Sequence, residues 1–202
     1  MRVIFATGNA NKLAEAQEAV QGRVEVLPLP EELSQLEVEE GERSFIENAV
    51  TKVLFYSQHL SGWVMAEDSG IVVDRLGGFP GPISNRIAET PEERNQRLIE
   101  IADQAGLITP EERSCRYVAS LALAFEGRLS LVVVAHTRGY LLSEPIGTGG
   151  FGYDPVFYSL ELDKPMGLAS REEKNSVSHR GKALRMMADY LTSRLGAKVG
   201  GG

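Results

Sequence analysis

Short apolar runs alternate along the chain with polar and glycine-rich segments, and the spacing of apolar residues within each run distinguishes strands from helices. Continuous apolar runs predict strands, which lie at residues 3–6, 24–27, 63–66, 71–73, 117–125 and 129–135. Residues 137–142 are a candidate for a further strand. Apolar residues at helical spacing predict helices, which begin after residues 12, 44, 90 and 178.

Two of these helices begin at recognisable capping sequences. Ser44 and Glu47 have the Ser-x-x-Glu spacing of a capping box, and Thr90 precedes Pro91 with Glu93 in the third position. Each pattern places a helix start next to its cap residue. Segments rich in Pro, Gly and Glu predict loops, which lie at residues 28–41, 77–82 and 147–152.

The order of the elements predicts an α/β protein with a mixed β-sheet. Strands and helices alternate at first, and the two apolar runs on either side of residues 126–128 then form a β-hairpin. No repeat or linker divides the chain. We therefore expect one domain over residues 1–195 and a flexible C-terminal tail over residues 196–202.

The composition narrows the class of ligand. The 202 residues, of which 43% are hydrophobic, are enough to bury one core. The formal net charge is −7 and Lys and Arg form no run, which argues against a surface for nucleic-acid polymers or anionic membranes. A small anion is still allowed, because a few local donors and a metal ion suffice to bind it.

Cysteine content and hydropathy indicate a cytoplasmic protein. Cys115 is the only cysteine, so the sequence offers neither an intrachain disulfide nor a thiolate zinc site. The first apolar run is too short for a signal peptide, and no stretch has the length of a membrane-spanning helix.

The turn after the first strand is a candidate anion site. Residues 7–12 read Thr-Gly-Asn-Ala-Asn-Lys, and they join a strand to a helix whose first N–H groups and dipole favour a negative charge. Gly8 allows close approach of the backbone, and Lys12 adds a point charge. The alternative is an ordinary turn in which the Asn side chains cap the helix.

A second candidate is the acidic sequence at residues 67–70, where we expect the apolar strand to end in a functional bend before it resumes. Hard cations such as Mg²⁺ prefer carboxylate and phosphate oxygens. Asp68 lies directly behind an apolar run, which favours a functional role for its carboxylate. For Glu37, Glu39 and Glu40 in the preceding loop, solvated charge is the favoured interpretation.

A third candidate is the glycine-rich segment at residues 147–155. It contains Gly-x-Gly-x-x-Gly, but Pro155 blocks the helix that a dinucleotide-binding turn requires. Phe151 and Tyr153 could instead stack on a flat base. They could equally pin the turn to the core.

The start of the last predicted helix gathers hydrogen-bond donors. Lys174 precedes the helix, and His179 and Arg180 lie near its N-terminus, which suits a phosphate or a carbonyl oxygen. A lone histidine at such a place is more often a cap or a surface residue, and its neighbours favour the binding role.

Taken together and in this order, these segments resemble the Ham1 family of inosine triphosphate pyrophosphatases, also called XTP/dITP diphosphatases. The matching residues span nearly the whole chain. They are Thr7-Gly8-Asn9 with Lys12, Ser44-Phe45 with Glu47-Asn48-Ala49 and Lys52, Glu67-Asp68-Ser69-Gly70, Gly77 to Pro82 with Arg86, Gly149 to Pro155, and Ser178-His179-Arg180.

The resemblance implies a fold, an activity and a site. The fold is a long central mixed sheet with flanking helices that form two lobes around a nucleotide cleft, in a homodimer. The activity is Mg²⁺-dependent hydrolysis of ITP, dITP and XTP to the monophosphate and pyrophosphate.

The resemblance also assigns roles to individual residues. Asp68 is the proton acceptor and a Mg²⁺ ligand, and Glu39 is the candidate second ligand, with Glu37 and Glu40 as alternatives. The residues implied to bind the nucleotide are Thr7, Gly8, Asn9, Ala10, Asn11 and Lys12 for the triphosphate, Lys52 and Arg86 for the positive lining, and Ser69, Phe151, Gly152, Tyr153, Asp154, Lys174, His179 and Arg180.

The sequence departs from the family pattern at residues 83–86, where Ile-Ser-Asn-Arg stands in place of the common Tyr-Ser-Ala-Arg. Two other functions stay open at this point. One is a pyrophosphatase for a different class of modified nucleotides, such as pyrimidine derivatives. The other is a regulatory module that binds such nucleotides without hydrolysis.

Overall fold

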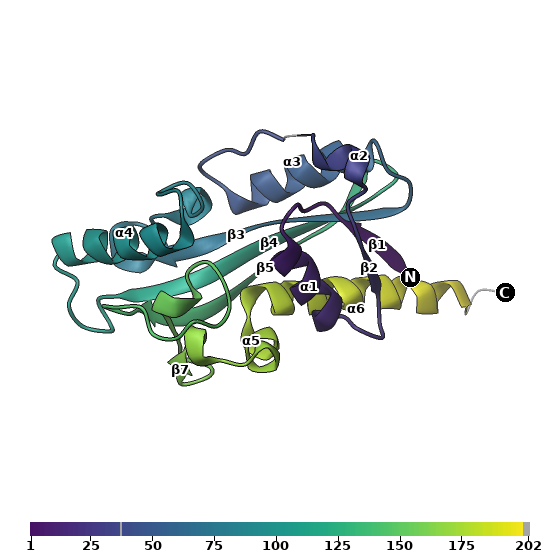
Figure 1. Cartoon of the computed structure of the whole chain (residues 1–202). Helices are drawn as coiled ribbons and strands as arrows, with labels where there is room; N and C mark the ends of the chain where they lie inside the picture. Colours follow the sequence, from purple (N-terminus) through teal and green to yellow (C-terminus); the bar gives the residue numbers. More distant parts are fainter. Residues whose placement is uncertain (37, 200–202) are drawn as a thin grey trace.

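The computed structural model describes residues 1–36 and 38–199. Within these residues, seven strands form one sheet in the order β2-β1-β3-β4-β5-β6-β7 (Figure 1). The strands are β1 (Arg2–Phe5), β2 (Glu25–Pro28), β3 (Trp63–Val73), β4 (Ser114–Phe125), β5 (Arg128–Leu141), β6 (Phe157–Ser159) and β7 (Lys164–Pro165). The pairs of β1 with β2 and β3 are parallel and the others antiparallel, which confirms the mixed sheet.

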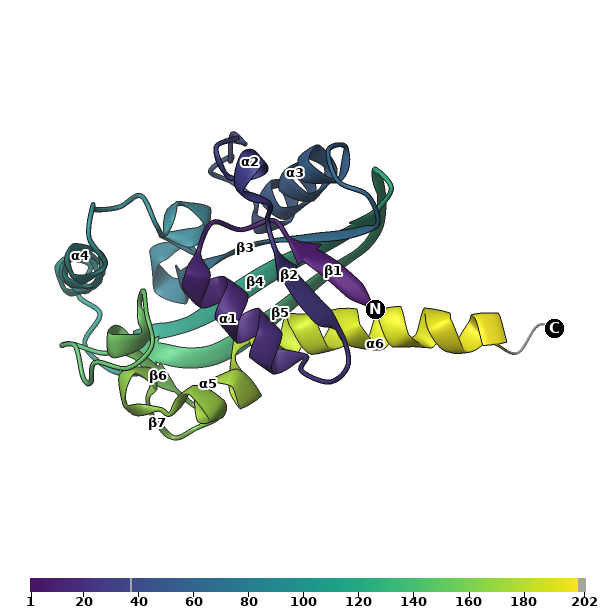
Figure 2. The ribbon, with the colours of Figure 1, turned by 45° about the vertical axis from the view of Figure 1, so that its right-hand side comes forward.

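Helices cover both faces of this sheet (Figures 1 and 2). The α-helices are α1 (Ala10–Ala19), α2 (Glu31–Ser34), α3 (Phe45–Ser57), α4 (Pro91–Gln104), α5 (Arg171–Val177) and α6 (His179–Val199). Short 3-10 helices lie at η1 (Asp74–Leu76), η2 (Gly81–Ile83), η3 (Asp154–Val156) and η4 (Met166–Leu168). In both views α3 lies on one side of the sheet, and α1 and α6 lie on the other.

Side-chain alternation along β3 and β4 divides the core between the two faces. Val64 and Ala66 pack with the apolar residues of α3, whereas Met65 packs with those of α1 and α6. Because successive side chains of a strand point to opposite faces, the same alternation continues into the polar residues that follow in β3. Ile71 then joins a third apolar cluster, which includes Leu98 of α4.

The predicted bend at residues 67–70 is wrong, because β3 runs unbroken through it. Glu67 to Gly70 stay paired with Leu121 to Val118 of β4. The polar side chains do not break the strand because each finds a partner on its own face of the sheet, as described below. The predicted hairpin is confirmed, and the further strand expected at residues 137–142 is the continuation of β5.

Several short elements escaped prediction. The helix α2 is a single turn within the expected loop at residues 28–41, and β6, β7 and α5 have no predicted counterpart. Strands of two or three residues and helices of one or two turns are too short to show a periodicity.

The predicted helix caps form in the structure. The Thr90 side chain accepts from the Glu93 N–H, and the Glu93 side chain accepts from the Thr90 N–H, which completes the capping box. At α3 only the Ser44 half forms, with the Ser44 hydroxyl accepting from the Glu47 N–H.

The last helix extends further than expected. It reaches Val199, so the tail predicted over residues 196–202 overlaps it at residues 196–199, and residues 200–202 lie outside the described residues. Among the described helices, none combines the length and the apolar composition that crossing a bilayer requires.

Neighbouring methionines of α6 allow a matched test of the packing. Met187 is 0% exposed in the core between α6 and the sheet, whereas Met186 is 47% exposed. We expect Met187→Ala to lower the free energy of unfolding by about 2–5 kcal/mol, because it leaves a cavity. Met186→Ala should change it by less than about 1 kcal/mol. Denaturant titration of both variants measures the difference, and equal effects would contradict the placement of α6.

Candidate active site

The edge of β3 is open in the middle of the sheet. On that edge β1 pairs only with Val64 and Met65, and in the described chain no other strand covers residues 67–71. Side chains satisfy the backbone there: the Lys52 Nζ donates to the Glu67 carbonyl at 2.8 Å, and the Ile71 N–H donates to the Ser84 Oγ at 3.1 Å. An uncovered strand edge inside a sheet leaves room for a ligand between β1 and the η2 loop.

Asp68 lies on the α3 face of this edge and is fixed by Asn48. The Asn48 Nδ2 donates to the Asp68 Oδ2 at 2.8 Å and to the Gly41 carbonyl at 2.9 Å. The Gly41 N–H in turn donates a hydrogen bond to the Asn48 Oδ1 at 2.8 Å. One buried amide therefore joins the acidic loop before α3 to the carboxylate of β3.

The surroundings of Asp68 make its carboxyl group a weaker acid. Burial raises the pKa of Asp68, while Lys52 and the Asn48 hydrogen bond oppose the shift and the Glu40 charge adds to it. The Glu40 carboxylate in turn pairs with the Lys52 Nζ at 2.7 Å. A cation at this point would relieve the repulsion between the two carboxylates.

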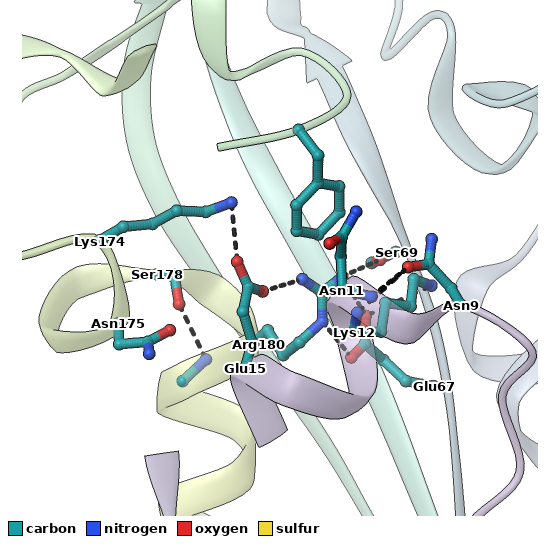
Figure 3. A network of polar contacts seen from close by, with 12 residues as sticks. Asn9, Asn11, Lys12, Glu15, Glu67, Ser69, Lys174, Asn175, Ser178 and Arg180 are labelled. Carbon is teal, nitrogen blue, oxygen red and sulfur yellow. Dashed lines mark hydrogen bonds and ion pairs between the residues drawn. The ribbon is translucent and has the colours of Figure 1, made fainter. Parts of the chain in front are cut away.

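The opposite face of the same edge carries a buried ion network centred on Arg180 (Figure 3). The Arg180 Nε donates to the Glu67 Oε2 at 2.7 Å, and its Nη2 donates to the Glu67 Oε1 at 3.0 Å and the Ser69 Oγ at 3.1 Å. Its Nη1 donates to Glu15 of α1. Arg180, Glu67 and Glu15 are each at most 5% exposed, so these charges depend on one another.

The network extends through Lys174 to the glycine-rich loop. The Lys174 Nζ lies 2.8 Å from the Glu15 Oε1 and 2.5 Å from the Asp154 Oδ2. Asp154 also accepts from the Phe151 N–H at 2.7 Å and from the Tyr117 hydroxyl at 3.2 Å. The Lys174 ammonium lies 4.1 Å from the centre of the Phe151 ring, so a charge and an aromatic face meet at the loop.

A cavity of about 260 Å³ opens beside this network. Elements far apart in the sequence contribute its walls. The lining residues are Asn9, Asn11, Lys12, Ser69, Gly70, Ser84, Asn85, Pro91, Arg94, Tyr117, Phe151, Gly152, Tyr153, Asp154, Lys174, His179 and Arg180.

His179 contributes a neutral ring to this cavity. Its imidazole stacks on Tyr117 with ring centres 4.6 Å apart, and its buried Nδ1 has no hydrogen-bond partner in the described chain. Burial and the neighbouring Arg180 hold the pKa of His179 well below its usual range. A neutral imidazole offers one donor and one acceptor to a ligand.

The capping interpretation of the turn at residues 7–12 is confirmed, and the anion site stays a prediction. The Asn9 side chain caps α1 by accepting from the N–H groups of Asn11 and Lys12 at 2.9 and 3.2 Å, as the capping alternative expects. The Lys12 Nζ meanwhile lies 3.7 Å from the Glu67 Oε1. The turn therefore adjoins the open edge of β3, which an anion site here requires.

Comparisons with known proteins agree with this geometry. The model of the Ham1 family matches residues 3–190. This chain belongs to the Ham1 family. Its relatives include the dITP/XTP pyrophosphatase of Geobacillus kaustophilus, 39% identical over 197 residues with 97% of both chains covered, and that of Bacillus subtilis, 35% identical with 93% and 96% covered.

Solved structures of Ham1 proteins share the fold. The HAM1 protein from Coxiella burnetii has a TM-score of 0.82 and 31% identity, with 96% of this chain and 99% of that one covered. The Ham1 protein of Staphylococcus aureus has a TM-score of 0.80 and 29% identity, with 96% and 100% covered.

The structure brings most of the residues implied by the Ham1 resemblance together. Eleven of them line the cavity, and they are Asn9, Asn11, Lys12, Ser69, Phe151, Gly152, Tyr153, Asp154, Lys174, His179 and Arg180. Thr7, Gly8 and Ala10 belong to the adjoining turn and the start of α1. Asp68 and Lys52 lie on the other face of β3, beside α3.

The acidic loop that contains Glu37, Glu39 and Glu40 contributes none of its described residues to the lining of the cavity. Glu39 is exposed, Glu40 pairs with Lys52, and Glu37 lies outside the described residues. The Arg86 Nη2 donates to the Glu40 carbonyl at 3.1 Å, so Arg86 contacts this loop.

Sequence patterns missed Glu15 and gave Asn48 no role of its own. Glu15 looks like any charged residue of an amphipathic helix, since its partners lie more than 150 residues away. Asn48 stands one helical turn before Lys52, and that spacing was a usable signal. Of Phe151 and Tyr153, Tyr153 anchors the glycine-rich loop to the protein, because its hydroxyl donates to the Ser84 carbonyl at 2.7 Å.

The buried pair of Glu67 and Arg180 predicts a pH-dependent stability. Burial alone raises the pKa of Glu67, and the charges of Arg180 and Lys12 more than reverse this, so its pKa lies well below the ordinary value of 4.5. A depressed pKa contributes stability above the unfolded value and loses it as the pH falls. We expect Glu67→Gln to cost about 3–5 kcal/mol near neutral pH, and the deficit to shrink below about pH 4.5.

Denaturant titrations of wild type and Glu67→Gln between about pH 7 and about pH 3 measure this difference. Glu25→Gln is the matched control, because Glu25 forms an exposed pair with Arg2. Curves for wild type and Glu67→Gln that stay parallel over the whole range would contradict the coupling.

Proposed function

We propose that this chain hydrolyses non-standard purine nucleoside triphosphates, namely ITP, dITP and XTP, to the monophosphate and pyrophosphate, and so cleanses the nucleotide pool. Its relatives named dITP/XTP pyrophosphatase support this. The observation that carries the proposal is the open edge of β3. There Asp68 on one face and the cationic, aromatic cavity on the other adjoin the start of α1.

The triphosphate lies across this edge in the proposed complex. Lys12 approaches from α1 and Lys52 from α3, and both already contact Glu67. The start of α1 adds its dipole to these charges. A polyphosphate in this position reaches the Asp68 face while its nucleoside enters the cavity of Phe151 and His179.

The residues beside Asp68 fit magnesium. No three potential ligands of the His, Cys, Asp and Glu types gather anywhere in residues 1–36 and 38–199. Mg²⁺ is commonly held by one or two carboxylates together with substrate phosphates, and Asp68 with Glu39 or Glu40 supplies that number. When bound, the ion neutralises phosphate charge and orients water.

Asp68 is the proposed general base. Attack of water on the α-phosphorus releases pyrophosphate, and the Asp68 carboxylate accepts the proton of that water. Burial raises the pKa of Asp68, which makes its carboxylate a better proton acceptor than an exposed aspartate. The Asn48 Nδ2 donates to the Asp68 Oδ2 and the Ser69 N–H donates to the Asp68 Oδ1 at 3.0 Å, so a hydrogen bond holds each carboxylate oxygen.

Selection among bases falls to His179 and to backbone N–H groups. Arg180 uses four of its five N–H donors on Glu67, Glu15 and Ser69, so at most one is left for a ligand. Hypoxanthine and xanthine carry an oxygen at position 6, which accepts from a donor. Adenine carries an amino group there and would leave a buried donor unpaired.

The other expected properties, of which only the homodimer is implied by the family resemblance, stay predictions. These are a cytoplasmic location, a homodimer, and no binding to nucleic-acid polymers or membranes. The two rival functions also make distinct predictions, because a pyrimidine-specific enzyme would prefer other substrates and a regulatory module would release no pyrophosphate.

Product analysis with ITP tests the function. We expect IMP and pyrophosphate when Mg²⁺ is present, little product after its removal, and much faster turnover of ITP and XTP than of ATP. Asp68→Asn should lower turnover by about two to four orders of magnitude while nucleotide still binds. Release of IDP and phosphate, or near-normal turnover by Asp68→Asn, would contradict the mechanism.

Two loop variants identify the second carboxylate. Glu40 pairs with Lys52 and its charge raises the pKa of Asp68, whereas Glu39 is exposed. One of these glutamates is expected to bind Mg²⁺. Changing that residue to Gln should raise the Mg²⁺ concentration at half-maximal turnover roughly tenfold. Titrating turnover against Mg²⁺ for Glu39→Gln and Glu40→Gln decides between them, and no shift in either would exclude both.

A further inference from the structure

Four cationic side chains line the cavity, and one of them differs from the rest. Lys12, Lys174 and Arg180 form the ion pairs with buried carboxylates described above. Arg94, the fourth, comes from α4 and forms no ion pair with any Asp or Glu in the described part of the chain. No carboxylate oxygen of the described residues therefore lies within ion-pair distance of its guanidinium.

Neutral groups hold the Arg94 guanidinium in place. Its Nη1 donates to the Asn85 Oδ1 at 3.3 Å, and its Nη2 donates to the Glu89 carbonyl at 2.9 Å. Its buried Nε has no partner in the residues described. Asn85 also lines the cavity, and it stands where the Ham1 pattern commonly has Ala. An arginine with an unpartnered donor and no direct ion pair favours an anionic or carbonyl acceptor from a ligand.

Arg94 approaches the cavity from a different element than the other cations near Phe151. Lys174 and Arg180 come from α5 and α6, whereas Arg94 comes from α4, and Figure 2 shows α4 well separated from α5. A planar base that enters the cavity is therefore met by donors from two walls. One wall can serve the oxygen at position 6, and the other is left for position 2.

We propose that Arg94, positioned by Asn85, binds the oxygen at position 2 of xanthine, so that the enzyme favours XTP over ITP and rejects GTP. This inference deepens the proposed function and rests on it.

Xanthine, hypoxanthine and guanine carry different hydrogen-bonding groups at position 2, and a guanidinium interacts differently with each. Xanthine has a carbonyl oxygen there, and its nucleosides lose a ring proton near neutral pH, which gives an anionic base. Hypoxanthine has only hydrogen at this position, so Arg94 neither gains nor loses a partner. Guanine has an amino group, whose donors would oppose those of the guanidinium in a confined site.

Kinetics of Arg94→Met test the proposal. We expect kcat/KM for XTP to fall roughly tenfold or more, kcat/KM for ITP to stay within about threefold, and kcat/KM for GTP to rise. Arg94→Lys, which keeps a charge but loses the planar fork, should retain part of the XTP preference. For wild type, the ratio of kcat/KM for XTP to kcat/KM for ITP should rise with pH as xanthine ionises. In Arg94→Met this ratio should change much less with pH.

Arg97→Met is the matched control, because Arg97 lies on the same helix, is largely exposed and pairs with Glu100. It should leave all three kcat/KM values unchanged. An equal loss on XTP, ITP and GTP in Arg94→Met would overturn the proposal, because the charge would then act on the phosphates or on the fold. If Arg94→Met changed kcat/KM for ITP relative to dITP but not relative to XTP, the proposal would also be overturned, in favour of a ribose contact.

The binding of products separates failure of this inference from failure of the proposed function. If wild type released pyrophosphate from none of these nucleotides, the proposed function would fail. Calorimetric titration with XMP and IMP would still decide the role of Arg94. Tighter binding of XMP that Arg94→Met abolishes supports the base contact, and equal binding of XMP and IMP by wild type overturns it.

Discussion

The burial of Arg180 is the constraint on which the site depends. Removing a guanidinium from water costs far more free energy than one hydrogen bond returns, so Arg180 is stable only while Glu67 and Glu15 both stay beside it. These residues belong to α6, β3 and α1. Satisfying one buried charge therefore fixes three elements relative to one another, and it places Lys12 and Ser69 at the same edge of the sheet.

The alternation of side chains along β3 assigns the two halves of the chemistry to opposite faces. Glu67 and Ser69 point toward Arg180, and Asp68 between them points toward Asn48 of α3. The cavity proposed to bind the base and the proposed catalytic carboxylate thus adjoin consecutive residues of β3 yet lie on different sides of the sheet. A ligand that uses both must cross the strand edge, which is possible because β1 ends before this point.

The sequence predicted long elements and missed what depends on distant partners. The hairpin, the mixed sheet and the helix caps followed from local periodicity and capping residues. The bend expected at Glu67 was wrong because strand propensity does not include the distant partners of a residue. The charge of Glu67 is neutralised by a residue 113 positions later in the sequence. The contacts of Asn48 and Arg94 likewise form only when loops, helices and strands meet.

The same long-range pairing has a consequence for how the polypeptide matures on the ribosome. The contact of Glu15 with Arg180 closes a loop of 165 residues, and that of Glu67 closes one of 113. Domains emerge N-terminal end first during synthesis, so the two glutamates near β1 and β3 leave the exit tunnel long before their arginine does. Until α6 is released, Glu67 and Glu15 lack the arginine that joins them, and completion of the native core awaits the last helix.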